Sequence, residues 1–290
     1  MSAFLTTTAT DETPAEYVAR HGRIETEFSH LTQDSGNVSW IVDAAEGRFF
    51  IKTAGTDAPP PPGAATPYSD RGGRIVGLRN AIALARSCDH PALPPLLNVI
   101  ETPISPMLVY PAVAGELIGI TNRPGLSRAE LRDDPASAYQ RFARLPADDQ
   151  LAVFDTLIDL HWRLADLGWV AGDLYDGCLI LDFTSRELHV VDLDEYRRGP
   201  SRNDMGRMFG STRFMAPEEF ELGALIDQAT TVFNLGRLAM HFGTRLTEDA
   251  AQFCGPRALA EVLERATETD RQDRYPSVAD FATAWWSARS

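Results

Sequence analysis

Cysteine, lysine and long apolar runs are all scarce in this chain of 290 residues. The three cysteines, Cys88, Cys178 and Cys254, lie far apart, without the paired spacing of a zinc site or a disulfide framework. No apolar run reaches the roughly 18 residues that a membrane helix needs, and the N-terminus lacks a basic, apolar secretory signal. These absences predict a cytoplasmic protein that does not insert into membranes.

Charge is also one-sided, because acidic residues exceed basic ones and the formal net charge is -14 with a pI near 4.8. This excess argues against nonspecific binding to nucleic acid or to a membrane surface. Of the 27 basic residues 26 are arginine, so 27 − 26 leaves one lysine, Lys52. Arginine does not replace lysine where a compact ammonium is required, and Lys52 is therefore a candidate functional residue.

The first part of the chain has the pattern of β-strands. Residues 1–22 are polar without a strong pattern, so we expect a loose arm there. Strand-like segments from Arg23 to Thr53 enclose a turn signal at Asp43–Gly47, which predicts a hairpin with Lys52 near the end of its second strand. Three further elements are expected: a loop over 53–70, a helix over Ile75–Ser87 and a short strand over Leu108–Tyr110.

The second part of the chain is mostly helical. Apolar spacing predicts helices over Leu151–Leu164, Val232–Phe242 and Val278–Trp286, and a second hairpin pairs Leu179–Leu181 with Leu188–Val191. A composition shift at residues 111–115 indicates a hinge between the two parts. The predicted fold class is therefore α+β with two lobes.

Three short stretches carry residues suited to phosphoryl transfer. Lys52 ends an apolar strand, Asp173 lies in a loop before the second hairpin, and Asp192 follows that hairpin. In such a set the lysine neutralises phosphate charge, the first aspartate accepts or orients the acceptor hydroxyl, and the second aspartate holds the metal that bridges the phosphates.

This order of residues resembles the eukaryotic-like protein kinases, in the style of the bacterial Ser/Thr kinases. The most specific match is Gly210–Glu218, which resembles the end of an activation segment, where the peptide substrate is positioned, with its Ala-Pro-Glu motif. The resemblance also pairs Glu218 with Arg274 near the C-terminus. It implies a bilobal kinase-like fold divided into an arm at 1–22, an N-lobe at 23–110, a hinge at 111–115 and a C-lobe at 116–290.

The resemblance further implies ATP as cofactor, with Mg²⁺ or Mn²⁺. Lys52 and Asp173 would be the catalytic residues, and Asp192 and Asp194 would bind the metal. Nucleotide contacts would come from the strand lysine, the glycine-rich loop and the hinge after Tyr110, namely Lys52, Gly36, Ser39, Ile41, Pro111 and Val113.

Several positions depart from the family pattern. The glycine-rich loop over 34–41 keeps one of three glycines, and the helix that should pair a glutamate with Lys52 offers Asn80 and Ala81. A thiol is a poor ligand for magnesium, so Asp194 is the candidate replacement for the metal-binding asparagine that Cys178 displaces. The remaining departures are Gly172 for arginine, Tyr175 for lysine and Thr231 for aspartate.

We therefore expect a phosphotransferase that acts on a protein Ser/Thr hydroxyl, with a protein substrate as its partner. One alternative is a small-molecule kinase of the aminoglycoside-phosphotransferase kind, because Gly172-Asp173-Leu174 resembles the catalytic loop of that family. The other is a pseudokinase that serves as a scaffold or switch, which the missing glutamate, asparagine and glycines favour. The oligomeric state and the substrate stay open.

Overall fold

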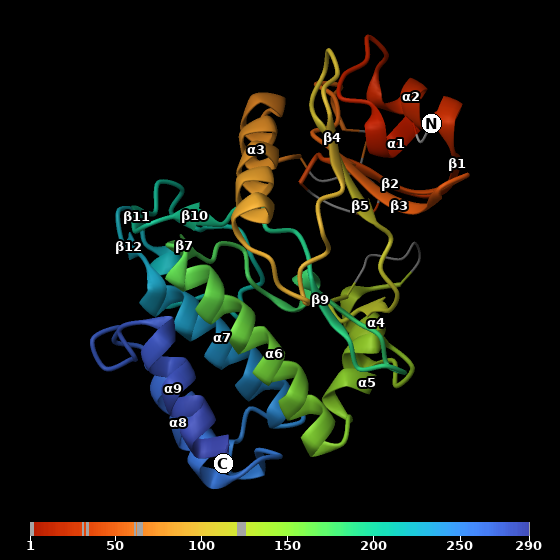
Figure 1. Ribbon diagram of the computed structural model, residues 1–290. Coiled ribbons are helices and arrows are strands. Elements are labelled where there is room, and N and C mark those ends of the chain that lie inside the picture. The colour runs from red at the N-terminus through yellow and green to blue at the C-terminus, as the bar shows by residue number, and fades with distance from the viewer. Residues whose placement is uncertain are drawn as a thin grey trace. The chain divides into compact units, whose positions relative to one another are not determined.

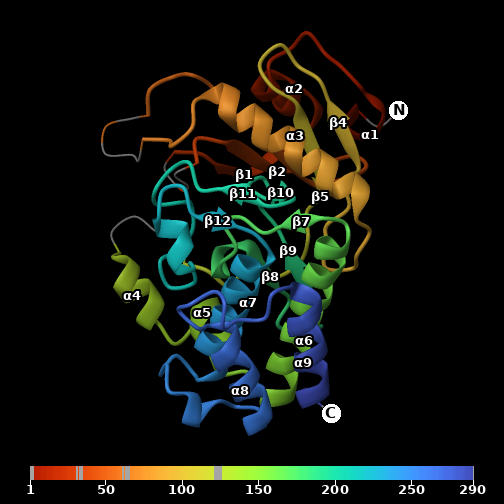
Figure 2. The same cartoon turned by 90° about the vertical axis from the view of Figure 1, so that its left-hand side faces the viewer.

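The computed structural model describes residues 3–30, 32, 35–60, 62, 66–120 and 126–289 of an α+β chain (Figures 1 and 2). The chain divides into two compact units. The first comprises residues 1–89, 93–114 and 121–127, and the second comprises 90–92, 115–120 and 128–290. The change of unit after Ala114 falls inside the predicted hinge at 111–115. The identity of the units as kinase lobes stays a prediction.

A five-stranded antiparallel sheet forms the first unit, in the order β1-β2-β3-β5-β4. The predicted hairpin is confirmed, with Lys52 one residue before the end of its second strand. The strands are β1 (Arg23–Phe28), β2 (Val38–Ala44), β3 (Gly47–Thr53), β4 (Asn98–Ile100) and β5 (Met107–Pro111).

Two short helices at the N-terminus, α1 (Ala3–Thr6) and α2 (Pro14–His21), cover one face of this sheet. Phe4 is fully buried in the same core cluster as Trp40 and Ile51, so the expectation of a loose arm over 1–22 is wrong. The helix start was encoded locally, because Thr13 and Glu16 form a reciprocal capping box.

Helix α3 (Arg71–Ser87) packs on the opposite face, where Leu78, Ala81 and Ile82 share a cluster with Leu108 of β5. It begins four residues before the predicted Ile75, because Asp70 caps it by accepting the Gly73 N–H at 2.8 Å. The buried Arg74 guanidinium donates to three carbonyls, those of Ala54, Thr56 and Ser69, at 2.7, 2.8 and 2.6 Å. This arginine ties the described ends of the predicted 53–70 loop to the helix.

The second unit is built on helices that pack side by side in both views (Figures 1 and 2). Three of them confirm predicted helices: α6 (Ala147–Asp166), α7 (Gln228–Gly243) and α9 (Val278–Arg289). Gly236 lets α7 pack closely against α8, the helix that ends at Ala266, since a Cβ at Gly236 would lie 2.8 Å from the Ala266 Cβ. The helices that were not predicted are α4 (Arg128–Asp133), α5 (Ala138–Ala143) and α8 (Arg257–Ala266).

Short strands frame the loops between these helices. The predicted hairpin is confirmed as β8 (Leu179–Leu181) and β9 (Leu188–Val190), joined at its edge by β6 (Glu116–Leu117). Two two-stranded ladders pair β7 (Trp169–Val170) with β10 (Arg197–Arg198), and β11 (Ser201–Arg202) with β12 (Leu225–Ile226). Single 3₁₀ turns lie at η1 (Asp176–Cys178), η2 (Pro217–Phe220) and η3 (Ala250–Gln252).

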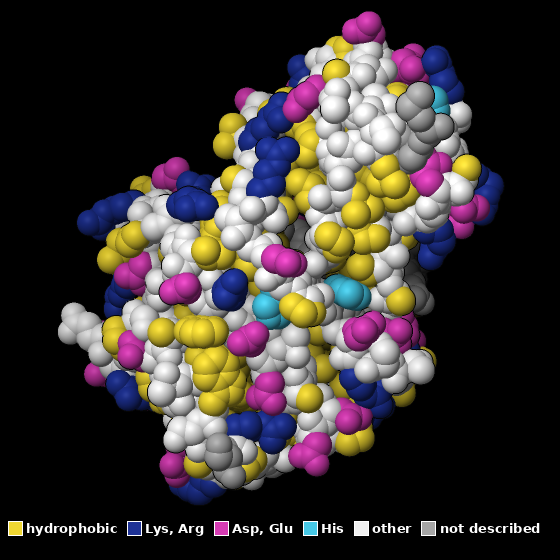
Figure 3. Space-filling view, viewed as in Figure 1, with side chains coloured by type: hydrophobic (Ala, Val, Ile, Leu, Met, Phe, Trp, Pro, Cys, Tyr) yellow, Lys and Arg dark blue, Asp and Glu magenta, His cyan; other side chains and the backbone are white. Residues whose placement is uncertain are grey.

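Acidic and basic side chains are interspersed on the face drawn in Figure 3, so the negative net charge is not gathered into one region of that face. Within the part of the chain that the structure describes, no helix has both the length and the apolar character of a membrane span.

The N-terminal helices should contribute measurably to the stability of the first unit. Phe4→Ala removes a fully buried ring and should lower the free energy of unfolding by about 3–5 kcal/mol. Leu5→Ala, at a neighbouring side chain that is 38% exposed, should cost less than about 1 kcal/mol. Urea denaturation followed by circular dichroism measures both values. A loss for Phe4→Ala as small as that for Leu5→Ala would show that the N-terminal segment does not belong to the core.

Candidate active site

In the first unit, three of the predicted nucleotide-binding residues share one face of the sheet. The register pairs Ser39 of β2 with Lys52 of β3, and Lys52 with Leu108 of β5. Ile41 lies two residues beyond Ser39 and so points to the same side. This is the face that α3 covers in part, opposite the N-terminal helices.

Lys52 is 8% exposed and Ser39 is 2% exposed, so the ammonium group of the chain's single lysine is held largely out of water. Burial of a charged ammonium is costly unless it is paired, and such a lysine is a functional candidate rather than a surface edge residue. Ala81, one of the two residues at the expected place of the glutamate partner, packs in the cluster of Leu108, the cross-strand neighbour of Lys52.

Gly36 and the predicted hinge have their own local explanations. Gly36 has a φ of 79°, and a Cβ there would lie 2.6 Å from Pro67 Cγ, so close packing against the protein's own chain already requires glycine. Pro111 ends β5, and the following Ala112 donates to the Arg48 carbonyl at 3.0 Å. Within the described residues Val113 N–H has no internal acceptor, which leaves it open to a ligand. Binding of a nucleotide by these residues stays a prediction.

In the second unit, Asp173 and Asp192 share an uncommon backbone conformation. Their φ angles are 57° and 63°, in the left-handed region that non-glycine residues rarely adopt. Such conformations cost of order 1 kcal/mol and persist where the surrounding structure imposes them, often at functional sites. The candidate catalytic Asp173 and the candidate metal ligand Asp192 thus lie in strained turns before and after the β8–β9 hairpin.

The surroundings of these two aspartates are buried and negatively charged. Burial, together with the charges of Asp173 and Asp192, raises the pKa of the Cys178 thiol well above its usual value. The protonated thiol donates to the Asp173 carbonyl at 3.1 Å. Burial, together with nearby negative charge, also raises the pKa of Tyr175, whose ring lies against Gly177, so its hydroxyl stays protonated.

The donor set after the hairpin fits a hard cation. Asp192 is exposed, Leu193 is 9% exposed and Asp194 is half-buried, so the buried leucine separates two carboxylates that reach the surface. No cluster of three or more His, Cys, Asp or Glu side chains with metal-binding geometry occurs among the described residues. Magnesium usually takes one or two carboxylates and completes its shell with phosphate and water, and Asp192 and Asp194 suit that arrangement.

Two of the departures from the kinase pattern have structural counterparts. A Cβ at Gly172 would lie 2.3 Å from the Glu195 carbonyl oxygen, so the backbone of the following segment occupies the space that a side chain would need. Thr231 accepts the Ala171 N–H at 3.0 Å and thereby ties the loop that carries Asp173 to helix α7.

The loop also contacts the Gly210–Glu218 segment. A Cβ at Gly210 would lie 3.5 Å from Asp173 Oδ1. Three residues further along both segments, Arg213 Nη2 lies 2.9 Å from Asp176 Oδ2. Nothing local in the sequence indicates this pair, because the two residues are 37 positions apart.

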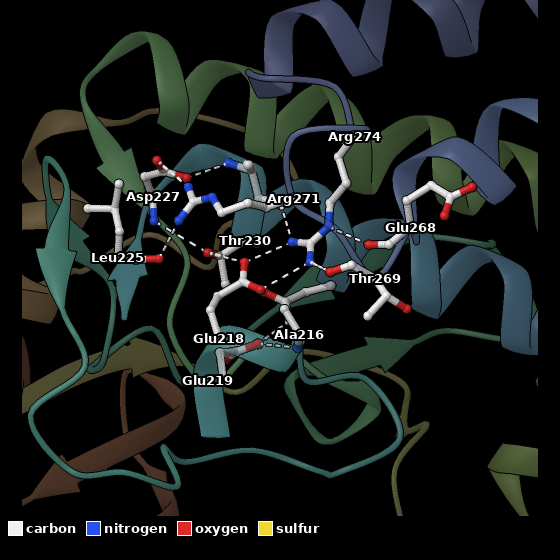
Figure 4. Close-up of polar contacts among 12 residues, drawn as sticks. Ala216, Glu218, Glu219, Leu225, Asp227, Thr230, Glu268, Thr269, Arg271 and Arg274 are labelled. Carbon is white, nitrogen blue, oxygen red and sulfur yellow. Dashed lines mark hydrogen bonds and ion pairs between the residues drawn. The ribbon is translucent and has the colours of Figure 1, made fainter. Parts of the chain in front are cut away.

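The predicted pair of Glu218 with Arg274 is confirmed as a bidentate, buried ion pair (Figure 4). Its two contacts are 2.8 and 3.0 Å long, and the Arg274 side chain is 0% exposed. Burial alone would raise the pKa of Glu218, but the hydrogen bonds from Arg274 hold it below its usual value.

Glu219, next to this pair, was not singled out from the sequence. It is 3% exposed, and its Oε2 accepts the Ala216 N–H at 2.6 Å and the Asn234 amide at 2.7 Å. Burial raises its pKa to about 7 despite these hydrogen bonds. The end of the Gly210–Glu218 segment is thus fastened to α7 by a carboxyl group that titrates near neutral pH.

The raised pKa of Glu219 predicts a pH-dependent effect of Glu219→Gln. The folded state keeps a proton that the unfolded chain releases above its ordinary pKa of 4.5, so this group lowers stability as pH rises from about 4.5 to about 7. A glutamine amide does not titrate and lacks that penalty, so the variant should gain on the order of 2 kcal/mol over the wild type between pH 5 and pH 8. Urea titrations at both pH values measure it.

Glu221→Gln removes the exposed neighbouring carboxylate and is the matched control for the loss of one charge. If the Glu219→Gln and wild-type curves stay parallel, then Glu219 does not titrate in this range.

Comparison with known proteins gives a distant similarity to viral kinases. No protein-family model matches the chain. A stretch of 103 residues is 24% identical to proteins named serine/threonine-protein kinase 1 from African swine fever virus, isolates Pig/Kenya/KEN-50/1950 and Tick/South Africa/Pretoriuskop Pr4/1996. The match covers 36% of this chain and 34% to 35% of those kinases, so the chain spans about a third of their length. The similarity supports a divergent, kinase-like relation.

Proposed function

We propose that this chain is an ATP- and magnesium-dependent phosphotransferase with a kinase-like fold, acting on a Ser/Thr hydroxyl of a protein. The observation that carries the proposal is the proximity of Asp173 to Gly210, where a Cβ would lie 3.5 Å from Asp173 Oδ1. It brings the candidate catalytic carboxylate next to the segment that resembles a kinase's peptide-positioning segment. The named function of the distantly similar viral proteins agrees with this assignment.

Each residue would have a distinct role in the reaction. Asp173 would accept the proton of the acceptor hydroxyl or orient that hydroxyl, because its carboxylate lies beside the substrate-positioning segment. Asp192, with Asp194 as second carboxylate, would hold magnesium, which supplies charge neutralisation for the phosphates. Lys52 would bind the phosphates, with Ser39 and Ile41 on the same sheet face. Pro111 would accept from the adenine and Val113 would donate to it.

Two other functions are each favoured by a specific observation. The buried, protonated Cys178 and the apolar Ala81 favour a pseudokinase, because neither supplies what an active kinase uses at that position. The Gly172-Asp173-Leu174 loop favours a small-molecule kinase. A protein acceptor would bind along the Gly210–Glu218 segment. The position of this segment beside Asp173 and Asp176 therefore supports the first proposal over both alternatives.

Incubation with γ-labelled ATP, magnesium and cell extract tests the proposal. Label on protein is expected; label on a small molecule only would identify the small-molecule kinase, and no label would identify the pseudokinase. Lys52→Met should reduce transfer by about 100-fold or more, because phosphate charge is no longer neutralised. Lys52→Arg should also fail, because a planar guanidinium does not replace the buried ammonium. Full activity of Lys52→Arg would exclude this role.

Substitution of Asp173 and of Asp192 by asparagine should affect different steps, turnover in the first case and ATP binding in the second. Asp192→Asn removes a hard anionic ligand and should weaken magnesium-dependent ATP binding on the order of tenfold. Asp173→Asn should leave ATP affinity nearly unchanged while kcat falls by about 100-fold or more. Calorimetry with ATP, with and without magnesium, and initial-rate kinetics measure the two effects. An equal loss of ATP affinity in both variants would show that the division of roles is wrong.

A further inference from the structure

A connected set of polar contacts holds the Gly210–Met215 segment from two sides. On one side, Arg213 pairs with Asp176 of the loop that carries Asp173. The Asp176 side chain is 2% exposed and that of Arg213 is 25% exposed, so this contact is much drier than an ordinary surface ion pair.

Two contacts join the loop to the segment, and both have the same offset in the sequence. Asp173 lies beside Gly210, and Asp176 binds Arg213, so both contacts join residues 37 positions apart in the sequence. Two contacts with one offset mean that the segments run alongside each other over this stretch. The Asp176–Arg213 pair therefore fixes how Gly210 lies against the Asp173 carboxylate.

On its other side, Arg213 belongs to a series of hydrogen bonds that links the segment to helices α5 and α7. Its Nη1 lies 3.4 Å from the Tyr139 hydroxyl of α5, which in turn lies 2.6 Å from Nε2 of His241 on α7. Nδ1 of His241 contacts Glu248.

This series of polar contacts closes on Arg213 itself. Glu248 pairs with Arg237 of α7 at 3.0 Å, and Arg237 Nε donates to the Arg213 carbonyl at 3.2 Å. Both the side chain and the backbone of Arg213 are thus held, so the segment cannot move at this residue without breaking several partly buried polar contacts.

We infer that Arg213 is a positioning residue that keeps the Gly210–Met215 segment in its substrate-accepting arrangement without phosphorylation of the chain. This inference rests on the proposed function and concerns the regulation of the same site. Kinase segments of this kind are commonly ordered when a phosphate on the segment pairs with an arginine. In this chain the positions are exchanged: the arginine, Arg213, lies on the segment, and its acidic partner, Asp176, lies on the loop.

The backbone supports this reversal. The loop position that would present an arginine to a segment phosphate is Gly172, where the Glu195 carbonyl leaves no room for a side chain. A carboxylate is always present, whereas a phosphate must be added. The arrangement therefore predicts a site that is ordered as soon as the chain has folded.

Hydrogen–deuterium exchange of the full-length chain tests the anchor independently of catalysis. Arg213→Met should increase exchange of amides 208–215 at least about tenfold, because it leaves a buried carboxylate unpaired. Arg213→Lys should restore part of the protection. Arg186→Met is the matched control, since Arg186 pairs with Asp149 at 2.9 Å in the same unit but outside this set of contacts. Its exchange over 208–215 should equal that of the wild type.

Asp176→Asn is the milder second variant, because an amide still accepts from Arg213 while one charge is lost. It should raise the same exchange several-fold and stay folded, as circular dichroism would verify. If Asp176→Asn, or a folded Arg213→Met, exchanges like the Arg186→Met control, then the pair does not anchor the segment and the inference is overturned.

Two kinetic measurements complete the test. Arg213→Met should raise the KM for a protein acceptor at least about tenfold and leave the Kd for ATP unchanged, a separation that general destabilisation would not produce. Wild-type protein treated with a protein phosphatase, and verified by intact mass, should match untreated protein in exchange and in activity. Loss of order after phosphatase treatment would overturn the inference. Absence of transfer in every sample with the exchange results as expected would overturn the proposed function and leave the anchor standing.

Discussion

One buried guanidinium organises the second unit. Arg274 has five N–H donors, and each meets an acceptor: two carboxylate oxygens of Glu218 and the carbonyls of Ala229, Glu268 and Thr269. It thereby joins η2, the start of α7 and the chain beyond α8 at a single point (Figure 4). Loss of either partner from such a pair commonly costs about 3–5 kcal/mol, because the remaining charge stays buried. The geometry of the Gly210–Glu218 segment depends on this fixed end.

Further hydrogen bonds hold the Gly210–Glu218 segment to helix α7. Glu219 and Asn234 hold its last residues to α7, and Asn234 also donates to the Phe214 carbonyl at 2.9 Å. The loop opposite is fixed by Thr231, which takes the place of an aspartate in the resembled family. The loop is thus fixed to α7 by a neutral hydroxyl, and it meets the segment at the Asp176–Arg213 pair.

The elements predicted from the sequence were those with long apolar periodicity or a compact turn. The β2–β3 hairpin and helices α6, α7 and α9 follow from such local patterns. The capping box of α2 was also local, but a polar composition concealed it. The Asp176–Arg213 pair and the buried Glu219 could not be predicted, because each depends on a partner distant in the sequence. The Glu218–Arg274 pair was predicted only through resemblance to a family.

The left-handed backbone at Asp173 and Asp192 has a consequence for how this chain can change over time. Glycine is the residue that would relieve the backbone at both positions, and it would raise stability at the expense of the charge. Stability and chemistry therefore favour different residues at the same two sites. Under the proposed function, a descendant of this chain that no longer needed the two carboxylates would gain backbone stability from glycine at either position.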